Sequence, residues 1–326
     1  MKRRSVLKAA LLAGAVSSMP AVLAAGYPDR ALRLVVPWPA GGVTDVVGRL
    51  LADRLSKELD QPIVVENRPG ANGFIGTDLV AKAKPDGYTL LLVTMTTHVI
   101  APNIYRKVPY DSVTDFAPVS QITAAPTIMV TPVSSPFGDV HELIAYAKAN
   151  PEKLNYATYG QGGSSQLAAQ LFMQAADIRM TPIPYQGATP AVIGLMSGDV
   201  DVFFDSIPSS LPNVLARKLK ALAVTSLERV AAAPDVPTMA EYFPDFEFMV
   251  WQGVEVPAGT PRSVIERLHA AIAKVVADPD MRQRLGGLGA FAVSSKTPEQ
   301  FGEHIVKEKS RWADVIARAG IPRIDN

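Results

Sequence analysis

The chain of 326 residues has no cysteine, and histidine and aromatic residues are scarce. Without cysteine it forms no disulfide and no zinc–thiolate site, and it lacks a thiol nucleophile. Its histidines show no metal-ligand spacing; they are His98, His141, His269 and His304. The sequence therefore predicts no metal site and no cofactor.

Motifs of the common hydrolases are also missing. No Gly-x-Ser-x-Gly nucleophile elbow occurs, and His141-Glu142 lacks the second histidine of a zinc protease. Asp199 and Asp201 would share one face of a strand, but a solvated strand entry explains them better than a catalytic carboxylate pair. We therefore predict no catalytic residue.

Residues 1–25 have the composition of a signal peptide. Lys2-Arg3-Arg4 makes the start basic, residues 9–16 are apolar, and small residues at 23–25 suit a signal peptidase. The apolar run is too short to span a bilayer. Arg3-Arg4 resembles a twin-arginine signal, and the general secretory route stays open as well. Either route predicts a periplasmic protein.

Cleavage of this leader changes the formal net charge from +1 to −3, with 28 Lys and Arg against 31 Asp and Glu. A mildly acidic protein without a long basic run is a poor partner for nucleic acid or anionic lipid. The remaining length suits two domains, on the usual prior of about one domain per 150 residues.

A strand, a glycine loop and a helix open the mature chain. Residues 32–36 form a β-branched run, and the apolar positions of 43–59 keep helical spacing. Between them, Gly41 and Gly42 let a ligand approach the main chain because they carry no Cβ. The helix start leaves unpaired N–H groups that attract anions, so the loop is a weak carboxylate or phosphate signal on its own.

Further strands at 63–66 and 88–93, with a helix at about 75–83, complete a parallel sheet. The polar segment 94–98 follows the last of these strands at the same sheet edge as the glycine loop. Thr96 and Thr97 offer hydroxyl donors or simply cap a turn, and a lone histidine such as His98 is more often structural.

The second half repeats the design. A strand at 119–130 crosses into a second α/β domain, where a helix at 134–150 and a strand at 154–158 precede a glycine loop and a helix at 167–176. Later strands end in polar residues, Tyr185-Gln186-Gly187 and Asp205-Ser206. A return strand at 246–256 and three helices starting near Pro261, Pro279 and Pro298 come back to the first domain.

We therefore predict domain I from residues 26–123 plus 251–326 and domain II from residues 124–250. The ligand cleft lies between them. Closure is expected as a hinge motion at the two crossings, near residues 123–126 and 248–252.

Several groups of residues together resemble the Bug-type solute-binding receptors of tripartite tricarboxylate transporters, over residues 27–321. No single group is specific for this family. The groups are Pro37-Trp38-Pro39-Ala40-Gly41-Gly42-Val43-Thr44-Asp45 with Arg49, Thr96-Thr97-His98 with Pro102 and Tyr105, Gly160-Gln161-Gly162, Tyr185-Gln186-Gly187 with Gly198 and Phe204-Asp205, and Trp251-x-Gly253 with Pro257-Ala258-Gly259-Thr260-Pro261.

The resemblance implies a two-lobed periplasmic-binding-protein fold of type II-like topology, with mostly parallel sheets flanked by helices and two interdomain crossings. It implies a receptor that closes around a small carboxylate and delivers it to membrane permease subunits. Main-chain N–H groups, hydroxyls and waters would hold the ligand. The implied ligand-binding residues are Trp38, Ala40, Gly41, Gly42, Val43, Asp45, Thr96, Thr97, His98, Tyr159, Gly160, Gln161, Gly162, Gly163, Ser164, Tyr185, Gln186, Gly187 and Asp205.

Departures from the family pattern bear on the ligand. Gly163, Gln166 and Gln186 stand where the family often has a hydroxyl or a basic side chain. The hypothesis is a ligand with less negative charge than citrate, such as a monocarboxylate, an aromatic acid or an amino acid. Asp45 either serves the helix start or faces the cleft, and Trp38 is either a cleft wall or part of the core.

Two other functions compete with transport. An extracytoplasmic enzyme would use the interlobe cleft as its active site, but it needs a base–nucleophile pair that the sequence does not show. A sensor would present the liganded receptor to a membrane kinase, and residues alone do not separate that role from transport.

Overall fold

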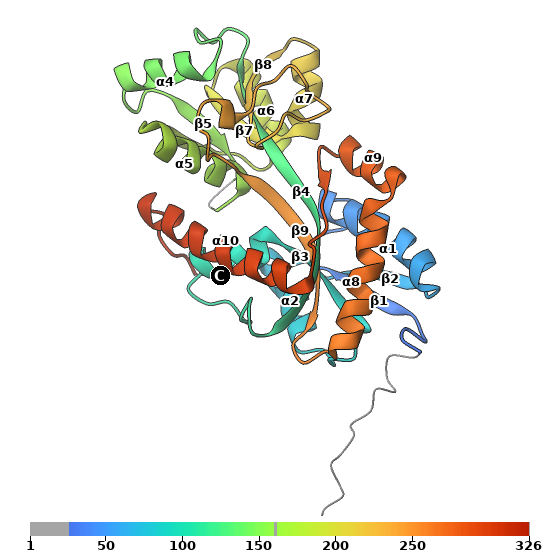
Figure 1. The fold of residues 1–326 in the computed structure, drawn as a ribbon. Helices are drawn as coiled ribbons and strands as arrows, with labels where there is room; N and C mark the ends of the chain where they lie inside the picture. Colours follow the sequence, from blue (N-terminus) through green and yellow to red (C-terminus); the bar gives the residue numbers. More distant parts are fainter. Residues whose placement is uncertain (1–25, 160–161, 326) are drawn as a thin grey trace, which may run out of the picture.

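The computed structural model describes residues 26–159 and 162–325; the predicted signal peptide and Gly160-Gln161 of the second glycine loop lie outside the described residues. Figure 1 shows two lobes joined by two long strands, β4 (Phe116–Pro132) and β9 (Met249–Pro257). The protein is a mixed α/β protein, in agreement with the fold class predicted from the sequence.

Lobe I begins with three parallel strands connected by helices. The registers pair Val36 with Asn67 and Leu34 with Leu90, so the carboxyl ends of the strands meet at one edge of the sheet. The elements are β1 (Leu32–Val36), α1 (Val43–Leu59), β2 (Ile63–Asn67), η2 (Ala71–Gly73), α2 (Phe74–Ala81), β3 (Thr89–Thr94), the π-helical turn η3 (Thr96–Ile100) and α3 (Ala101–Ile104).

Lobe II repeats the strand–loop–helix order. Its helix α4 begins at Val140 rather than at the predicted residue 134, because Pro136 and Gly138 disfavour helix and Asp139 caps the start by accepting from Glu142 N at 2.8 Å. The elements are α4 (Val140–Ala149), β5 (Asn155–Thr158), α5 (Ser164–Ala176), β6 (Thr181–Pro184), α6 (Ala188–Ser197), β7 (Val202–Ser206), α7 (Ile207–Leu215), β8 (Leu219–Val224) and η4 (Met239–Glu241).

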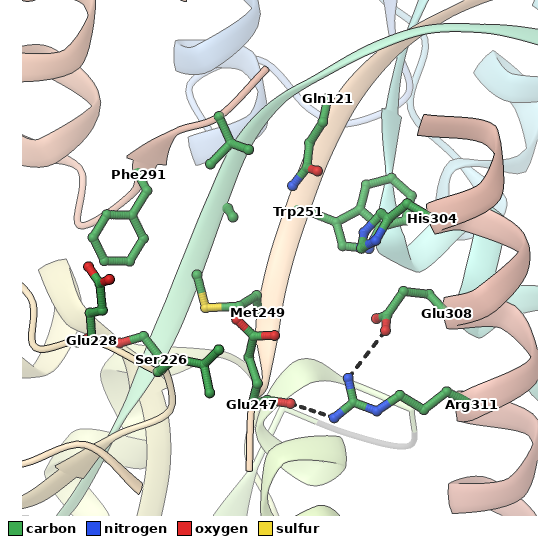
Figure 2. A pocket seen from close by; sticks show the side chains of 13 residues that line it. Gln121, Ser226, Glu228, Glu247, Met249, Trp251, Phe291, His304, Glu308 and Arg311 are labelled. Atoms are coloured by element: carbon green, nitrogen blue, oxygen red, sulfur yellow. Dashed lines mark hydrogen bonds and ion pairs between the residues drawn. The ribbon is translucent and has the colours of Figure 1, made fainter. Parts of the chain in front are cut away.

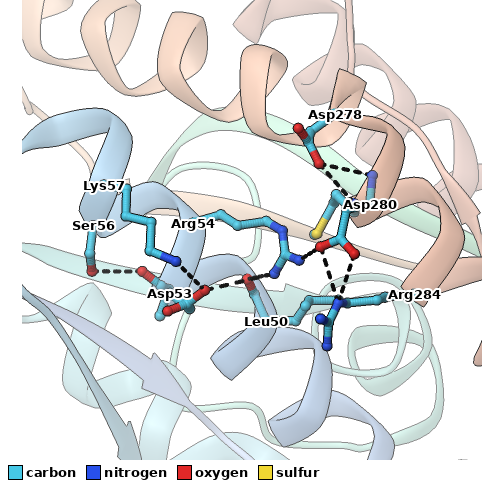
Figure 3. Close-up of polar contacts among 10 residues, drawn as sticks. Leu50, Asp53, Arg54, Ser56, Lys57, Asp278, Asp280 and Arg284 are labelled. Atoms are coloured by element: carbon cyan, nitrogen blue, oxygen red, sulfur yellow. Dashed lines mark hydrogen bonds and ion pairs between the residues drawn. The ribbon is translucent and has the colours of Figure 1, made fainter.

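The C-terminal segment returns to lobe I, and its three helices begin at or beside the predicted prolines. The elements are α8 (Arg262–Ala277), α9 (Pro279–Gly287), β10 (Phe291–Ala292) and α10 (Pro298–Arg318). Figure 3 shows how α9 is fastened to α1: Arg54 forms an ion pair with Asp280, which also accepts from Arg284. Asp278 caps α9 by accepting from the main-chain N–H groups of Asp280 and Met281.

One sheet runs through both lobes in the order β2-β1-β3-β9-β4-β7-β5-β6, and β8 and β10 also pair with β4. The first half of β4 pairs with β9, and its second half pairs with β7 and β8. The strands on either side are parallel, whereas those at the crossing are antiparallel. Among the described residues, no helix is both long and apolar enough to cross a membrane.

Helix α10 packs across β9 because a glycine leaves room for it. A Cβ at Gly253 would lie 2.2 Å from the ring of Phe301, so only glycine allows this approach. Trp251 packs edge-on against Phe301 with ring centroids 5.6 Å apart, and Phe248 packs against Trp312 at 5.4 Å. These aromatic contacts fix the C-terminal helix at the crossing between the lobes.

Candidate functional site

Loop I, residues 37–42, connects β1 to the start of α1. Gly41 has a φ of +83°, and Gly42 is extended and forms the N-cap of α1 without a side-chain cap. Asp45, the third residue of the helix, accepts a hydrogen bond from Gly41 N at 2.8 Å. Residues 40–43 are exposed, so the unpaired N–H groups of the helix start lie near solvent.

The Asp45 carboxylate holds loop I in position through hydrogen bonds. Its carboxylate accepts from Arg49 Nε at 2.9 Å and from Asn67 Nδ2 at 2.9 Å, and Asn67 also donates to the carbonyl of Trp38 at 3.0 Å. The Arg49 bond, with help from Gly41 and Asn67, lowers the pKa of Asp45 to about 2, against the effect of burial. Asp45 is therefore ionised, and both of its oxygens serve the loop in this structure.

Loop II, residues 159–163, has the same construction at the start of α5. Gly162 has a φ of +75°, and Gly163 is the extended N-cap, again without a side-chain cap. Gln166, the third residue of α5, accepts from Gly162 N at 2.7 Å. Asp45 and Gln166 thus occupy equivalent positions in the two lobes. One is charged and the other neutral.

Tyr159 and Asp205 hold the other end of loop II. The Tyr159 hydroxyl donates to Asp205 Oδ1, Ser210 Oγ donates to Asp205 Oδ2 at 2.6 Å, and Tyr159 N donates to Ser165 Oγ at 3.0 Å. Asp205 is fully buried. Burial, together with the Asp205 carboxylate, raises the pKa of Tyr159, so the phenol keeps its proton. Both predicted site residues therefore act as supports in this structure.

Both loops lie beside η3 and α3 of lobe I. A Cβ at Gly162 would lie 2.3 Å from Ile104 Cδ1, so loop II touches lobe I directly. On the other side, a Cβ at Gly73 would lie 2.8 Å from Thr97 and 3.5 Å from the Trp38 ring. Trp38 is partly buried, and its indole N–H has no hydrogen-bond partner within residues 26–159 and 162–325.

Two of the predicted ligand-binding residues in η3 are inaccessible. Thr97 and His98 expose none of their surface, whereas Thr96 is partly exposed. His98 Nε2 lies 2.7 Å from Glu255 Oε2 on β9, and its ring packs against Tyr110 and Phe116. In this structure neither Thr97 nor His98 reaches a ligand with its side chain, because the strand end closes into a π-helical turn.

The loop at residues 185–187 follows β6 at the same edge as loop II. Tyr185 N donates to the carbonyl of Thr158 at 2.8 Å, next to Tyr159. The Tyr185 side chain lies over Gly194 of α6, where a Cβ would lie 2.3 Å from the hydroxyl, so it packs against its own lobe. Gln186 is exposed.

Residues 47–321 match the sequence model of the tripartite tricarboxylate transporter family receptor. The chain belongs to this receptor family. It is 41% identical over 316 residues to a UPF0065 protein from the tcbD-tcbE intergenic region of Pseudomonas sp. strain P51, covering 96% of this chain and 94% of that protein. It is 36% identical over 296 residues to protein BugT of Bordetella pertussis, covering 90% of each.

Two similar solved structures contain carboxylates. R. palustris Rpa4515 with adipate is 34% identical, has a TM-score of 0.77, and is matched over 91% of this chain and 100% of that chain. MatC (Rpa3494) from Rhodopseudomonas palustris with bound malate is 34% identical with a TM-score of 0.72, over 89% and 100% of the chains. The predicted resemblance to Bug-type receptors is confirmed.

Sequence reasoning missed several residues that hold the receptor's loops. Asn67 lies at the carboxyl end of β2, directly beside Val36, so the strand-end argument applied to β2 would have found it. Glu255 and Ser210 face His98 and Asp205 through tertiary contacts that no sequence pattern marks. Within the described parts of the receptor, no group of three or more His, Asp or Glu side chains is placed to hold a metal ion.

Proposed function

We propose that this receptor captures a small carboxylate between its lobes and delivers it to a tripartite tricarboxylate-type permease. One observation carries the proposal: two helices from different lobes, α1 and α5, begin with the same uncapped Gly-Gly construction, and both loops lie beside η3 and α3. Each start presents N–H groups and the positive end of a helix dipole to an anion. The adipate and malate complexes of two relatives support the same ligand class.

We propose that the carboxylate contacts those predicted site residues that are accessible. The two predicted loop II residues that lie outside the described structure are kept among these proposed contacts. The remaining predicted residues do not contact the ligand in this proposal and instead hold the loops in position. They are Thr97, His98, Asp45, Tyr159 and Asp205. The proposed contacts are Trp38, Ala40, Gly41, Gly42, Val43, Thr96, Gly160, Gln161, Gly162, Gly163 and Ser164, with Tyr185, Gln186 and Gly187 at the rim.

Charge at the loops favours a ligand with few negative charges. Arg49 lies on α1 behind loop I, and its guanidinium is bound to Asp45 and Asn67. Asp45 itself is ionised. A multiply charged acid would therefore meet a carboxylate in lobe I without a free basic partner there. We propose a monocarboxylate, an aromatic acid or an amino acid in preference to citrate.

The strength of such binding can be estimated. A hydrogen bond to a charged group contributes about 1.5–3 kcal/mol net, so four of them reach about 8 kcal/mol when closure costs little. That value corresponds to a dissociation constant of about 1 μM. Neutral donors on two lobes therefore suffice for a receptor of micromolar affinity.

We propose that the leader at residues 1–25 is cleaved on export and that the receptor works in the periplasm as a binding protein rather than as an enzyme. The proposed domain limits are residues 26–123 plus 251–326 and residues 124–250. The continuous strands β4 and β9 support crossings near these limits.

A thermal-shift screen of the purified protein tests the proposal. Adipate, malate, citrate, benzoate and single amino acids are compared with their methyl esters or amides, which keep the body and remove the charge. A ligand at about 100 times its dissociation constant stabilises the protein by about 2.7 kcal/mol. We expect a monocarboxylate or amino acid to stabilise more than citrate.

Mass spectrometry of the ligand after release tests the binding-protein role, because a receptor returns it chemically unchanged. A screen in which no acid stabilises the protein contradicts the proposal. So does a ligand recovered as a product. Stabilisation by citrate alone would refute the charge preference and leave carboxylate capture intact.

A further inference from the structure

A cavity lies at the crossing between the lobes, on the side of β9 that faces α10 (Figure 2). Its volume is about 400 Å³, which is within the range of small-molecule sites. Both lobes contribute to it: β4, β9, β10 and α10 form one side, and the segment after β8 forms the other. We call it the hinge pocket and define it by six of its lining residues, Glu228, Glu247, Met249, Trp251, Phe291 and His304.

The hinge pocket is separate from the carboxylate site. Trp251 and Gln252 are neighbours in β9 and therefore point to opposite faces of the strand. Gln252 Nε2 donates to Thr44 Oγ1 at 3.3 Å, next to loop I, whereas Trp251 lines the hinge pocket. No residue of loop I or of the described part of loop II lines the pocket.

Aromatic rings and a thioether make up the apolar part of the hinge pocket's lining. Trp251, of which 1% is exposed, packs edge-on against His304 with ring centroids 5.4 Å apart. Phe291 lies on the opposite side from Trp251, and Met249 lies between them (Figure 2). Aromatic faces with a thioether between them suit a planar apolar body, and their electron-rich surfaces also attract a cation.

The charge at the pocket that is not neutralised is negative. Arg311 donates to Glu308 Oε1 at 3.2 Å and to the carbonyl of Glu247 at 2.6 Å, and Glu308 also accepts from Trp312, so these groups are already paired. Glu228 lies beside Phe291 and Glu247 beside Met249 (Figure 2). Within the described residues, neither carboxylate forms an ion pair.

Two ring nitrogens in the pocket wall are also unsatisfied. Trp251 Nε1 and His304 Nε2 are buried and have no hydrogen-bond partner in residues 26–159 and 162–325. Burial lowers the pKa of His304, so this ring adds no positive charge at neutral pH and its free nitrogen can accept. Buried polar groups without partners are rare, and water in the pocket can supply these partners, so the two nitrogens do not by themselves select the occupant.

We propose that the hinge pocket is a second binding site, which takes a small organic cation with a planar apolar body. The ammonium group lies between the Glu228 and Glu247 carboxylates, and the body lies between Trp251 and Phe291. The site does not depend on the carboxylate ligand proposed above, since it uses other residues and the opposite charge.

Titration with benzylammonium, the cation of benzylamine at neutral pH, tests the proposal, with tryptophan fluorescence and calorimetry as readouts. Benzyl alcohol has the same body without the charge. We expect benzylammonium to bind with millimolar affinity or better, and benzyl alcohol to bind at least about tenfold more weakly. Equal binding of the two probes, or no binding of the cation at about 10 mM, would overturn the proposal.

A pair of variants locates the binding. The double variant Glu228→Gln and Glu247→Gln removes both carboxylates without changing their size. Its control, Glu152→Gln with Glu266→Gln, removes two exposed carboxylates that lie outside the pocket and line no part of it. We expect at least about a tenfold loss of benzylammonium affinity in the first and less than about twofold in the second. Equal losses would mean a general charge effect, and no loss in the first would place the cation elsewhere; either result overturns the proposal.

Discussion

The bracing of the two glycine loops can be tested by replacing the third residue of each helix with alanine. Alanine keeps the helix, and Asp45→Ala and Gln166→Ala remove the acceptors of the Gly41 and Gly162 N–H groups. Asp45 binds three donors, but two of these belong to exposed residues, Gly41 and Arg49, which return to water. We therefore expect the loss of about one charge-assisted bond, or about 1.5–3 kcal/mol, rather than three times that value.

Gln166→Ala should cost less, because the lost bond from Gly162 N joins neutral groups and contributes about 0.5–1.5 kcal/mol. Urea unfolding measures both values, provided that the slope m stays unchanged. Asp53→Ala is the control on α1: Asp53 is exposed, and its ion pairs are with exposed Lys57 at 3.1 Å and with Arg54 at 3.9 Å, so the change should stay within about 0.5 kcal/mol.

Asp45→Ala and Gln166→Ala should also bind the carboxylate found in the ligand screen about tenfold more weakly. A loop that has lost its internal hydrogen bond must be ordered when the ligand binds, and this ordering lowers the affinity. Calorimetry measures this loss. The reasoning is refuted if Asp45→Ala unfolds at the same urea concentration as Asp53→Ala, or if Gln166→Ala costs more than Asp45→Ala.

Three further outcomes are expected. Gly162→Ala adds a Cβ at positive φ against Ile104, so calorimetry should show at least about tenfold weaker carboxylate binding. Adding Ile104→Ala to this variant should restore part of the lost affinity. Unchanged affinity in Gly162→Ala would contradict the contact between loop II and Ile104. Glu255→Leu removes the carboxylate that lies 2.7 Å from the buried His98 Nε2 and should lower the free energy of unfolding by about 1–3 kcal/mol, the usual cost of a buried polar group left without a polar neighbour; unchanged urea unfolding would contradict the pairing. The pKa of Asp45 is lowered to about 2, so the stability that its carboxylate adds is fully present above about pH 4 and is lost as the pH falls through about 2. The difference in Tm between wild type and Asp45→Asn should therefore stay constant from about pH 8 to about pH 5. A decline of this difference within that interval would contradict the lowered pKa.

Local patterns predicted most of the secondary structure. The apolar spacing of residues 43–59 and the prolines before the three last helices gave boundaries that the structure matches within one residue. The strand predicted at 119–130 extends over Phe116–Pro132 in spite of its prolines: Pro118 lies at a register shift, Pro126 lies where the pairing with β9 ends, and Pro132 lies at the strand end. Whether a strand tolerates a proline depends on how it pairs with the neighbouring strand. The periodicity of the sequence does not contain that pairing.

The glycine loops were predicted from their position after strands, but their internal bonds were not. Gly41 with Asp45 and Gly162 with Gln166 are each four residues apart, a spacing that becomes meaningful only once both glycines adopt positive φ. The His98–Glu255 contact joins residues far apart in sequence. It forms through the pairing of β3 with β9, which no local pattern encodes.

The passage of β4 through both lobes has a consequence for unfolding. The hydrogen-bond ladder of this strand is shared, first with β9 and then with β7 and β8, so no flexible linker separates two independent cores. Melting of either half would strip partners from the other half of the same strand. The protein should therefore lose its structure in a single cooperative transition, and neither half should fold when expressed alone.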